Sequence, residues 1–293
     1  MIGALTRNVR RTRGWCVLGA LAALASSACN VSQSEERELG AEEAAQVDSE
    51  LPLVGDTTVT RFISALGHSL ASRTSRADLE WRFAVVNTDD VNAFALPGGF
   101  VYVNRGLIEQ SDRLDELAGV MGHEIGHVVR RHSVKQIEET GKRDVGLVLL
   151  CTLTDACRGV GGRIAVRVGA DAMAAQYSQH DEAQADSEGV IIVRRAGIDP
   201  EGLPAFFEKL MAQRTEEPTP IDAFFSTHPT DERRIATVRR QIAALGAPRG
   251  ETLVRDTPEF QAIRERVRAL PPPPSDSAVA QRRAHVVAGR GQR

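Results

Sequence analysis

Apolar side chains recur at two different spacings in the part of the chain that follows residue 50. From Thr58 onward they are three or four residues apart, at Val59, Phe62, Ile63, Leu66 and Leu70. This spacing predicts an amphipathic helix, with capping residues at 56–58. Three short apolar runs follow at residues 81–86, 93–96 and 100–103, with polar or Pro-Gly turns between them. Such runs predict a small antiparallel β-sheet.

Longer helical patterns occupy the chain from there to about residue 268. The longest begins at Ser111 or Asp112, either of which can cap it, and extends to about Ser133. Asp115 and Glu116 lie in its first turn, where acidic residues stabilise a helix. Further helices are predicted at about residues 179–196, 201–213, 231–245 and 258–268. The predicted fold class is therefore mainly α with a small antiparallel β-sheet (α+β).

The amino-terminal end of the chain differs from this middle part. Arginines precede an apolar run at residues 15–25, and small residues lead from there to Cys29, so residues 1–28 have the order of a secretory signal peptide. A Cys in this place resembles a bacterial lipoprotein cleavage site. We therefore expect a lipid on Cys29 that anchors the protein to a membrane, with simple cleavage after Ala28 as the alternative.

The remaining segments outside the helical patterns are classified by composition. Residues 29–50 are polar and acidic, which predicts a flexible tether or a weak helix. The folded domain is predicted at residues 51–270, and the Pro- and Arg-rich residues 271–293 are predicted to be a disordered tail. The apolar residues 144–153 are too few to cross a bilayer and predict a buried segment or a surface that dips into a membrane or a substrate.

Cysteines and charge narrow the class of protein further. In an oxidising compartment Cys151 and Cys157 are close enough in sequence for a disulfide, which we favour over two separate buried thiols. The formal net charge is −3, and only 4% of the 293 residues are aromatic. Neither value fits a basic surface or a stacking platform for nucleic acid, so we expect no nucleic-acid partner.

The chemically most specific pattern is His123-Glu124-Ile125-Gly126-His127, inside the longest predicted helix. Residues four apart lie above one another on a helix, so both imidazoles can bind one metal ion. Glu124 is offset by one position and can instead take a proton from a water that the metal activates. The pattern predicts a metallopeptidase centre with Glu124 as the general base.

A catalytic zinc site needs a third protein ligand and one open position. The best candidate is Glu182, which lies four residues before Asp186 on the next long helix. Glu182 can bind the metal while Asp186 accepts a hydrogen bond from the far nitrogen of a ligand histidine. The ordinary interpretation of acidic residues at this spacing is a solvated helix face. Only the presence of the His123–His127 motif makes a metal ligand the better interpretation here.

Four blocks of the sequence resemble the prenyl-protease and HtpX-like family of gluzincin metallopeptidases, in its secreted branch. They are residues 92–99, residues 123–127, residues 182–186 with Gly189, and residues 226–229 with Arg234. The resemblance covers about residues 55–245 and implies a zincin-like domain with one zinc ion bound by His123, His127 and Glu182. It also implies endopeptidase activity on protein substrates. Gln179 and Gln184 depart from the family pattern, and we interpret both as changes on the helix surface.

The resemblance implies that the loop with His228 lies near the metal, with Arg234 beside it. We consider two roles there: His228 or Arg234 stabilises the oxyanion of the reaction, or His228 occupies the open metal position in a resting state. The strand at residues 100–103 either pairs with substrate as an edge strand or merely completes the sheet. We assign no functional role to His132, which is five residues beyond His127.

The combined interpretation is an exported zinc endopeptidase of the bacterial periplasm, anchored through Cys29. The family suggests that its substrates are misfolded or unfolded envelope proteins. One alternative keeps the zinc but makes the protein a chaperone-like binder of unfolded strands with latent or slow proteolysis. Another is a lipoprotein scaffold without enzymatic activity. The sequence predicts neither the cleavage preference nor the oligomeric state.

Overall fold

The computed structural model describes residues 31–139, 177–246, 252–275 and 277–279. The chain forms two compact units, one of residues 1–35 and 134–165 and one of residues 36–133 and 166–293. All predicted site residues except Cys29 belong to the second unit. The signal peptide, Cys29, the segment 144–153, Cys151 and Cys157 and most of the tail lie outside the described residues.

The sheet of the second unit has three strands, β1 (Arg82–Val86), β2 (Ala93–Leu96) and β3 (Phe100–Asn104), in the order β1-β3-β2. β2 pairs antiparallel with β3, as predicted, but β1 pairs parallel with β3. The sheet is therefore mixed, and the prediction of a purely antiparallel sheet is wrong in this respect. Successive strands reverse direction, so β1 and β3 run the same way, and they become neighbours because β3 inserts between β1 and β2.

This order also changes which strand lies at the edge of the sheet. Residues 100–103 belong to β3, which is hydrogen-bonded on both sides and cannot pair with a substrate. The interpretation of this segment as an edge strand is wrong. Among the described strands, β2 is an edge, and it leads through the turn Pro97–Gly99 into β3.

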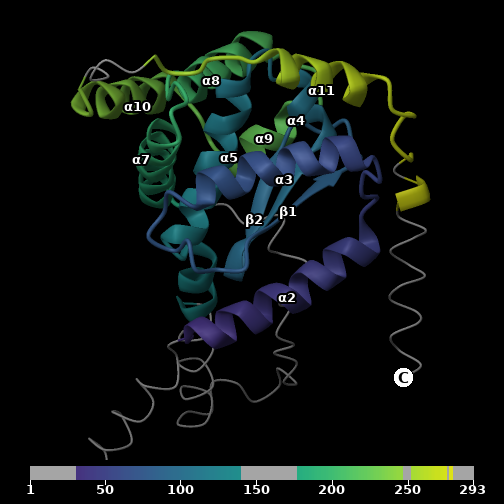
Figure 1. The fold of residues 1–293 in the computed structure, drawn as a ribbon, viewed down its shortest axis with the longest axis horizontal. Coiled ribbons are helices and arrows are strands. Elements are labelled where there is room, and N and C mark those ends of the chain that lie inside the picture. The colour runs from purple at the N-terminus through teal and green to yellow at the C-terminus, as the bar shows by residue number, and fades with distance from the viewer. Residues whose placement is uncertain (1–30, 140–176, 247–251, 276, 280–293) are drawn as a thin grey trace, which may run out of the picture. The chain divides into compact units, whose positions relative to one another are not determined.

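The two faces of the sheet pack against different helices. Phe83, Val85, Val101 and Val103 lie in the main core together with residues of α3 (Thr57–Ala71) and α5 (Leu114–Val129). The side chains that alternate with them on the strands, including Tyr102, face α2 (Gln33–Glu50) in a smaller cluster. Figure 1 shows α3 and α2 on opposite sides of the strands. The alternation of buried positions is what allows a three-stranded sheet to support two layers.

Helix α2 occupies most of residues 29–50, for which the composition predicts a flexible tether or a weak helix. Ala44 and Val47 pack into the smaller cluster, and the hydroxyl of Tyr102 donates a hydrogen bond to the Ala44 carbonyl at 3.2 Å. Glu36 is fully buried and forms ion pairs with Arg76 and Arg131 at 2.8 Å. The polar composition of this segment does not predict a packed helix, because buried ion pairs, rather than an apolar stripe, attach much of α2 to the domain.

The predicted helical pattern of the remaining chain is confirmed in outline. Asp56 caps α3 by accepting hydrogen bonds from the amides of Thr58 and Val59. The longest predicted helix is shorter than predicted, because α5 begins at Leu114, without a cap from Ser111 or Asp112, and ends at Val129; the short helix α4 (Arg105–Gln110) precedes it. The later helices are α7 (Gln179–Arg195), α8 (Gly202–Gln213), α9 (Asp222–Thr227), α10 (Glu232–Ala244) and α11 (Pro258–Arg268). None of the helices in the described ranges has both the length and the apolar character of a membrane span.

The described part of the tail continues along the domain. The Pro271 carbonyl accepts a hydrogen bond from Arg105 at 2.6 Å, and Val279 packs against the α2 cluster. The predicted domain end at residue 270 lies close to the end of α11 at Arg268. The prediction of disorder from residue 271 onward does not hold for Pro271 and Val279, because both contact the folded unit.

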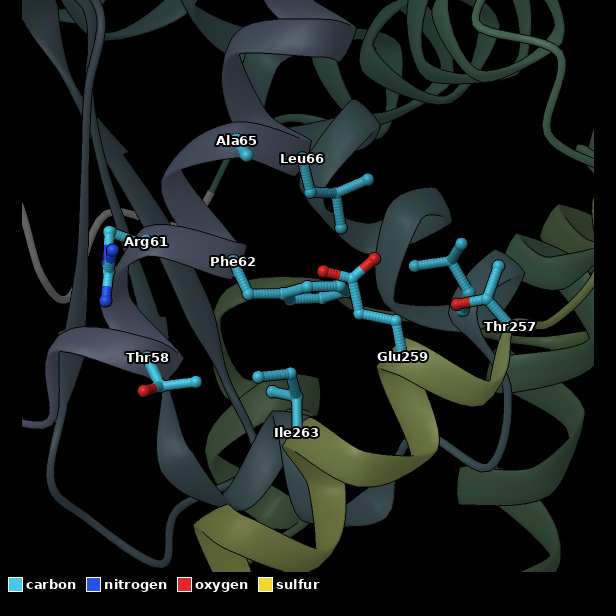
Figure 2. A pocket seen from close by; sticks show the side chains of 9 residues that line it. Thr58, Arg61, Phe62, Ala65, Leu66, Thr257, Glu259 and Ile263 are labelled. Carbon is cyan, nitrogen blue, oxygen red and sulfur yellow. The ribbon is translucent and has the colours of Figure 1, made fainter.

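One groove lies between α3 and α11, with a volume of about 480 Å³. Figure 2 shows Phe62 of α3 and Ile263 of α11 facing this space, with Glu259 beside the phenyl ring. None of the predicted metal ligands lines it. The groove is therefore separate from the chemistry that the sequence predicts.

Candidate metal centre

Helix α5 carries the two histidines of the sequence motif in a fully buried part of the core. His123 and His127 are each 1% exposed, and their Nε2 atoms lie 2.9 Å apart. Four residues on an α-helix make slightly more than one turn, which stacks both rings on the same face. The apolar residues around them, such as Met121 and Ile125, pack into the main core and hold the helix in place.

Helix α7 supplies Glu182 from its first turn. Ser178 caps this helix and forms a capping box with Asp181, which fixes where the helix begins. The carboxylate oxygens of Glu182 lie 3.6 Å from Nε2 of His123 and 3.4 Å from Nε2 of His127. The structure thus brings together the three residues that the sequence predicts as ligands.

Glycines allow α5 and α7 to approach closely enough for this arrangement. A Cβ atom on Gly126 would lie 2.7 Å from the Ala185 carbonyl oxygen, and one on Gly189 would lie 2.9 Å from the His123 amide nitrogen. Both are contacts with backbone, which cannot rotate away as a side chain can. Gly126 of the His-Glu-Ile-Gly-His motif is therefore needed so that the Glu182 carboxylate can reach the histidines.

The spacing of these donor atoms fits a divalent metal ion. Ligand atoms about 2.0–2.1 Å from one tetrahedral ion lie about 3.3–3.4 Å from each other. The Nε2 and carboxylate distances of 2.9, 3.4 and 3.6 Å bracket that value. Together with His228, the three residues form a buried group whose ligand atoms all lie within 4.8 Å of one another. Two imidazoles and a carboxylate are a donor set that suits zinc.

Behind His123 lies a buried charged pair. Nδ1 of His123 lies 2.8 Å from a carboxylate oxygen of Asp186, which accepts its proton. Arg234 donates two hydrogen bonds of 2.8 Å to Asp186 and forms a 2.7 Å ion pair with Glu182. Burial raises the pKa of Asp186, but Arg234 and His123 outweigh it and lower that pKa to about 2. Asp186 is therefore a carboxylate that orients a ligand ring.

Arg234 is occupied by these contacts. Besides the two carboxylates, its guanidinium donates a hydrogen bond of 3.0 Å to the Pro229 carbonyl. Burial lowers the pKa of Arg234, yet Asp186 and Glu182 raise it above its ordinary value. Because the guanidinium already contacts two carboxylates and a backbone carbonyl, it orients Glu182 and Asp186. The geometry therefore does not favour the oxyanion role considered for Arg234.

Behind His127 lies His132, a residue to which the sequence assigns no role. Nδ1 of His132 lies 2.9 Å from Nδ1 of His127, and its Nε2 lies 3.0 Å from the amide oxygen of Gln184. The sequence interpretation requires a continuous helix to Ser133, in which a residue five positions on points elsewhere. α5 instead ends at Val129, and the positive φ of 57° at Arg131 turns the chain back toward the ligand.

Glu124 and His228 face each other at the open side of the ligands. Nε2 of His228 lies 3.2 Å from Oε1 of Glu124, while its Nδ1 lies 3.3 Å from both Glu182 oxygens and from Nε2 of His123. Burial raises the pKa of Glu124, but the neighbouring histidines, His228 foremost, lower it below its usual range. Burial lowers the pKa of His228, but Glu124 and Glu182 raise it to about 10.

Oε1 of Glu124 is the group that a hydrolytic reaction would use. This buried oxygen has no partner with hydrogen-bond geometry among the residues that the structure describes, although the His228 ring lies within ion-pair distance. A buried carboxylate oxygen without a hydrogen bond carries a desolvation cost, and a hydrogen bond from a water molecule would offset that cost. The position beside the ligand atoms is where a general base for water is expected.

The chain is similar to a set of known metalloproteases. The sequence profile of peptidase family M48 matches residues 58–242. The beta-barrel assembly-enhancing protease of Escherichia coli K12 is 30% identical over 223 residues, which are 74% of this chain and 45% of that protein. The mitochondrial metalloendopeptidase OMA1 of Schizosaccharomyces pombe is 29% identical over 195 residues, 67% of this chain and 56% of that protein. The metalloprotease LoiP of Escherichia coli K12 is 26% identical over 227 residues, 76% of this chain and 86% of that protein. The chain therefore spans about half the length of the first two relatives.

Proposed function

The chain belongs to peptidase family M48 and is a metalloprotease, and we propose that it is a zinc-dependent endopeptidase that cleaves misfolded or unfolded envelope proteins. The observation that carries the proposal is the convergence of His123, His127 and Glu182 beside Glu124. Their donor atoms have the spacing of a tetrahedral zinc site, and they come from two helices, α5 and α7, that only folding brings together. One zinc ion per chain is the expected stoichiometry.

The residues around the site have distinct tasks in peptide hydrolysis. A zinc ion bound by His123, His127 and Glu182 supplies a Lewis acid that polarises a scissile carbonyl and makes water acidic. Glu124 is ionised at neutral pH because the histidines lower its pKa, so its Oε1 can take a proton from the attacking water and return it to the leaving amine. The burial of all four groups keeps bulk water away from this proton transfer.

His228 is proposed to occupy the open position of the site until substrate arrives. Its Nδ1 lies as close to His123 and Glu182 as a fourth ligand would, and its Nε2 contacts the general base. Both contacts compete with the water that Glu124 must deprotonate. With zinc bound, His228 would give up to the metal the place of the proton that Glu124 and Glu182 stabilise on its ring in the metal-free site. A ring in this place favours a latent resting state over an oxyanion role.

The edge strand β2 is the proposed platform for substrate. It is paired on one side by β3 and contacts α5, so an extended peptide could add to its other side near the metal ligands. Recognition through backbone hydrogen bonds makes little demand on sequence, which suits unfolded substrates. The name of the Escherichia coli relative, beta-barrel assembly-enhancing protease, supports a role in the bacterial envelope. Periplasmic export and a lipid anchor at Cys29 accordingly remain part of the proposal.

Glu124→Gln tests the proposed chemistry directly. The amide keeps the shape of the side chain but cannot act as a base, so hydrolysis of unfolded casein should fall about 10²–10⁴-fold. Zinc content, measured by atomic emission on the purified protein, should stay near one ion per chain because Glu124 is not among the three ligands. Casein cleavage that is equally fast in the variant and the wild type would contradict the role of Glu124.

The alternative of a chaperone-like binder with latent proteolysis is supported by the place of His228. If the ring keeps the site closed, His228→Ala should raise the rate of casein cleavage, while zinc stays bound. If His228 stabilises the oxyanion, the same variant should lose activity. A protein that binds unfolded casein and zinc but cleaves nothing, with or without His228, would favour the binder.

A further inference from the structure

The ligand His127 is held from behind by another histidine, and that histidine is held in turn by α7. Nε2 of His132 lies 3.0 Å from Oε1 of Gln184 and 3.4 Å from a carboxylate oxygen of Asp181. The His132 side chain is 1% exposed and its Nδ1 lies 2.9 Å from Nδ1 of His127. The ring therefore connects the far nitrogen of a metal ligand to two oxygen atoms on the helix that carries Glu182.

The directions of these hydrogen bonds follow from what each group can donate. The carboxylate of Asp181 and the amide oxygen of Gln184 only accept, so Nε2 of His132 carries the hydrogen. The Asp181 carboxylate, 3.4 Å away, favours the same direction because it too can only accept. In a neutral ring the other nitrogen, Nδ1, then has a lone pair. His127 must donate its Nδ1 hydrogen to that lone pair.

This arrangement leaves the lone pair of His127 on Nε2, the atom that faces His123 and Glu182. The Asp186 carboxylate fixes His123 in the same way, because it accepts the Nδ1 hydrogen of that ring. Two Nε2 lone pairs then meet at 2.9 Å next to a carboxylate, and such a group of acceptors needs a metal ion, or a donor such as a protonated His228, among them. Without His132, His127 could carry its hydrogen on Nε2 and donate it to His123.

We propose that His132, oriented by Gln184 and Asp181, is a positioning residue that fixes His127 in the tautomer needed to bind the metal. The proposal rests on the proposed zinc site and adds a residue to it. Gln184, interpreted from sequence as a change on the helix surface, becomes part of the support of a ligand. Its Nε2 lies 3.0 Å from Nε2 of His180 and can donate to that ring, which fits the orientation of the amide in which Oε1 faces His132.

Nuclear magnetic resonance of the zinc-loaded, ¹⁵N-labelled protein can read the tautomers. Long-range ¹H–¹⁵N correlations distinguish a protonated ring nitrogen from an unprotonated one in each of the seven histidines. The expected result is hydrogen on Nε2 of His132 and on Nδ1 of His127. A spectrum in which His132 carries its hydrogen on Nδ1 overturns the proposal, because His132 could then not accept from the ligand.

Two substitutions of similar shape separate positioning from packing. His132→Asn keeps an oxygen that can accept near the place of Nδ1, whereas His132→Leu has the same branching and accepts nothing. Zinc affinity, measured by competition with a chromogenic chelator, should fall about 10–100-fold in His132→Leu and clearly less in His132→Asn. A purely structural role predicts that the apolar Leu does as well as Asn or better, and equal affinities in the two variants overturn the proposal.

A third variant addresses the outer part of the connection and guards against misfolding of the first two. Gln184 is only partly buried, and Gln184→Met removes the amide while Asp181 remains as an acceptor for His132. Its zinc affinity should fall less than that of His132→Leu, and Gln184→Glu should restore it. Wild-type protein that binds no zinc overturns the proposed function as well, while normal zinc binding in both His132→Leu and Gln184→Met overturns this proposal alone.

Discussion

His123 and His127 lie one turn apart on α5, yet the groups behind them differ in burial and in access to solvent. Behind His123, a buried carboxylate, Asp186, is paired with a nearly buried guanidinium, Arg234. Behind His127, the ring of His132 is followed by the partly buried side chains of Gln184 and Asp181 and by the exposed His180. In both arrangements the group next to the ligand histidine accepts its Nδ1 hydrogen.

One requirement of metal binding is thus met by two kinds of structure, with different consequences for stability. A buried ion pair is costly to break, because removal of one partner leaves the other charge without solvent or partner. A chain of partly buried and exposed groups that leads to the surface loses less, because water can replace its outer members. We therefore expect substitutions on the His123 side to cost folding free energy and those on the His127 side to act mainly on the metal.

Asp186→Ala should have the largest effect on the free energy of unfolding. It leaves the Arg234 guanidinium with Glu182 as its remaining carboxylate and removes the acceptor of the His123 ring. Loss of one member of a buried ion pair costs about 3–5 kcal/mol. Urea unfolding of the metal-free protein, followed by circular dichroism, measures it.

Asp181→Ala is the matched control on the same helix. Asp181 belongs to the capping box of α7 and to the His127 side, and loss of a helix cap costs about 1 kcal/mol. Equal losses of stability in Asp181→Ala and Asp186→Ala would mean that the His123 side and the His127 side do not differ in what they contribute to folding.

Glu36→Ala should have the next largest effect, and it acts on the His127 side from a distance. Glu36 holds Arg131, whose positive φ turns the chain so that His132 reaches His127. It also pairs with Arg76, which donates a hydrogen bond of 2.9 Å to the carbonyl of Val128 at the end of α5. Because the Arg131 side chain is 36% exposed, we expect about 2–4 kcal/mol, somewhat less than for a fully buried pair. Urea unfolding measures the stability, and zinc competition should show weaker binding.

Glu43→Ala provides the control for Glu36, since both residues lie on α2. Burial raises the pKa of Glu43, and its Oε2 has no hydrogen-bond partner in the described part of the chain. Its removal should be neutral or stabilising, because no ion pair is lost and a desolvation cost is relieved. A destabilisation as large as that of Glu36→Ala would show that α2 is attached by its packing and that the Glu36 ion pairs matter little.

The sequence predicts most helices because their ends are marked locally. Asp56, Ser178 and Thr257 accept hydrogen bonds from the first turns of α3, α7 and α11, and Gly197 has the positive φ expected after α7. Prediction fails where the decisive partners are distant in sequence. The pairing of β1 with β3, and the attachment of α2 through Glu36 to Arg76 and Arg131, depend on contacts that no local pattern encodes.

The same distinction explains what the sequence can predict of the metal centre. His123 and His127 are predictable because helical periodicity alone brings them together. Glu182 and Asp186 are also four apart, and they need only the assumption that their helix meets α5. His132 escapes prediction because its place depends on the end of α5 at Val129 and on the turn at Arg131. The one available signal is the departure from the family pattern at Gln184, which marks the partner of His132.

His180→Ala should have the smallest effect, and it tests how far the support behind His127 extends toward the surface. His180 is exposed and its Nε2 lies 3.0 Å from the Gln184 amide nitrogen, so water can take its place when the ring is removed. Zinc affinity by chelator competition should stay within about twofold of wild type, as for other surface substitutions. A loss as large as that of His132→Leu would mean that the amide of Gln184 is oriented by His180 alone. The His127 side would then depend on each of its members as strictly as the His123 side depends on its ion pair.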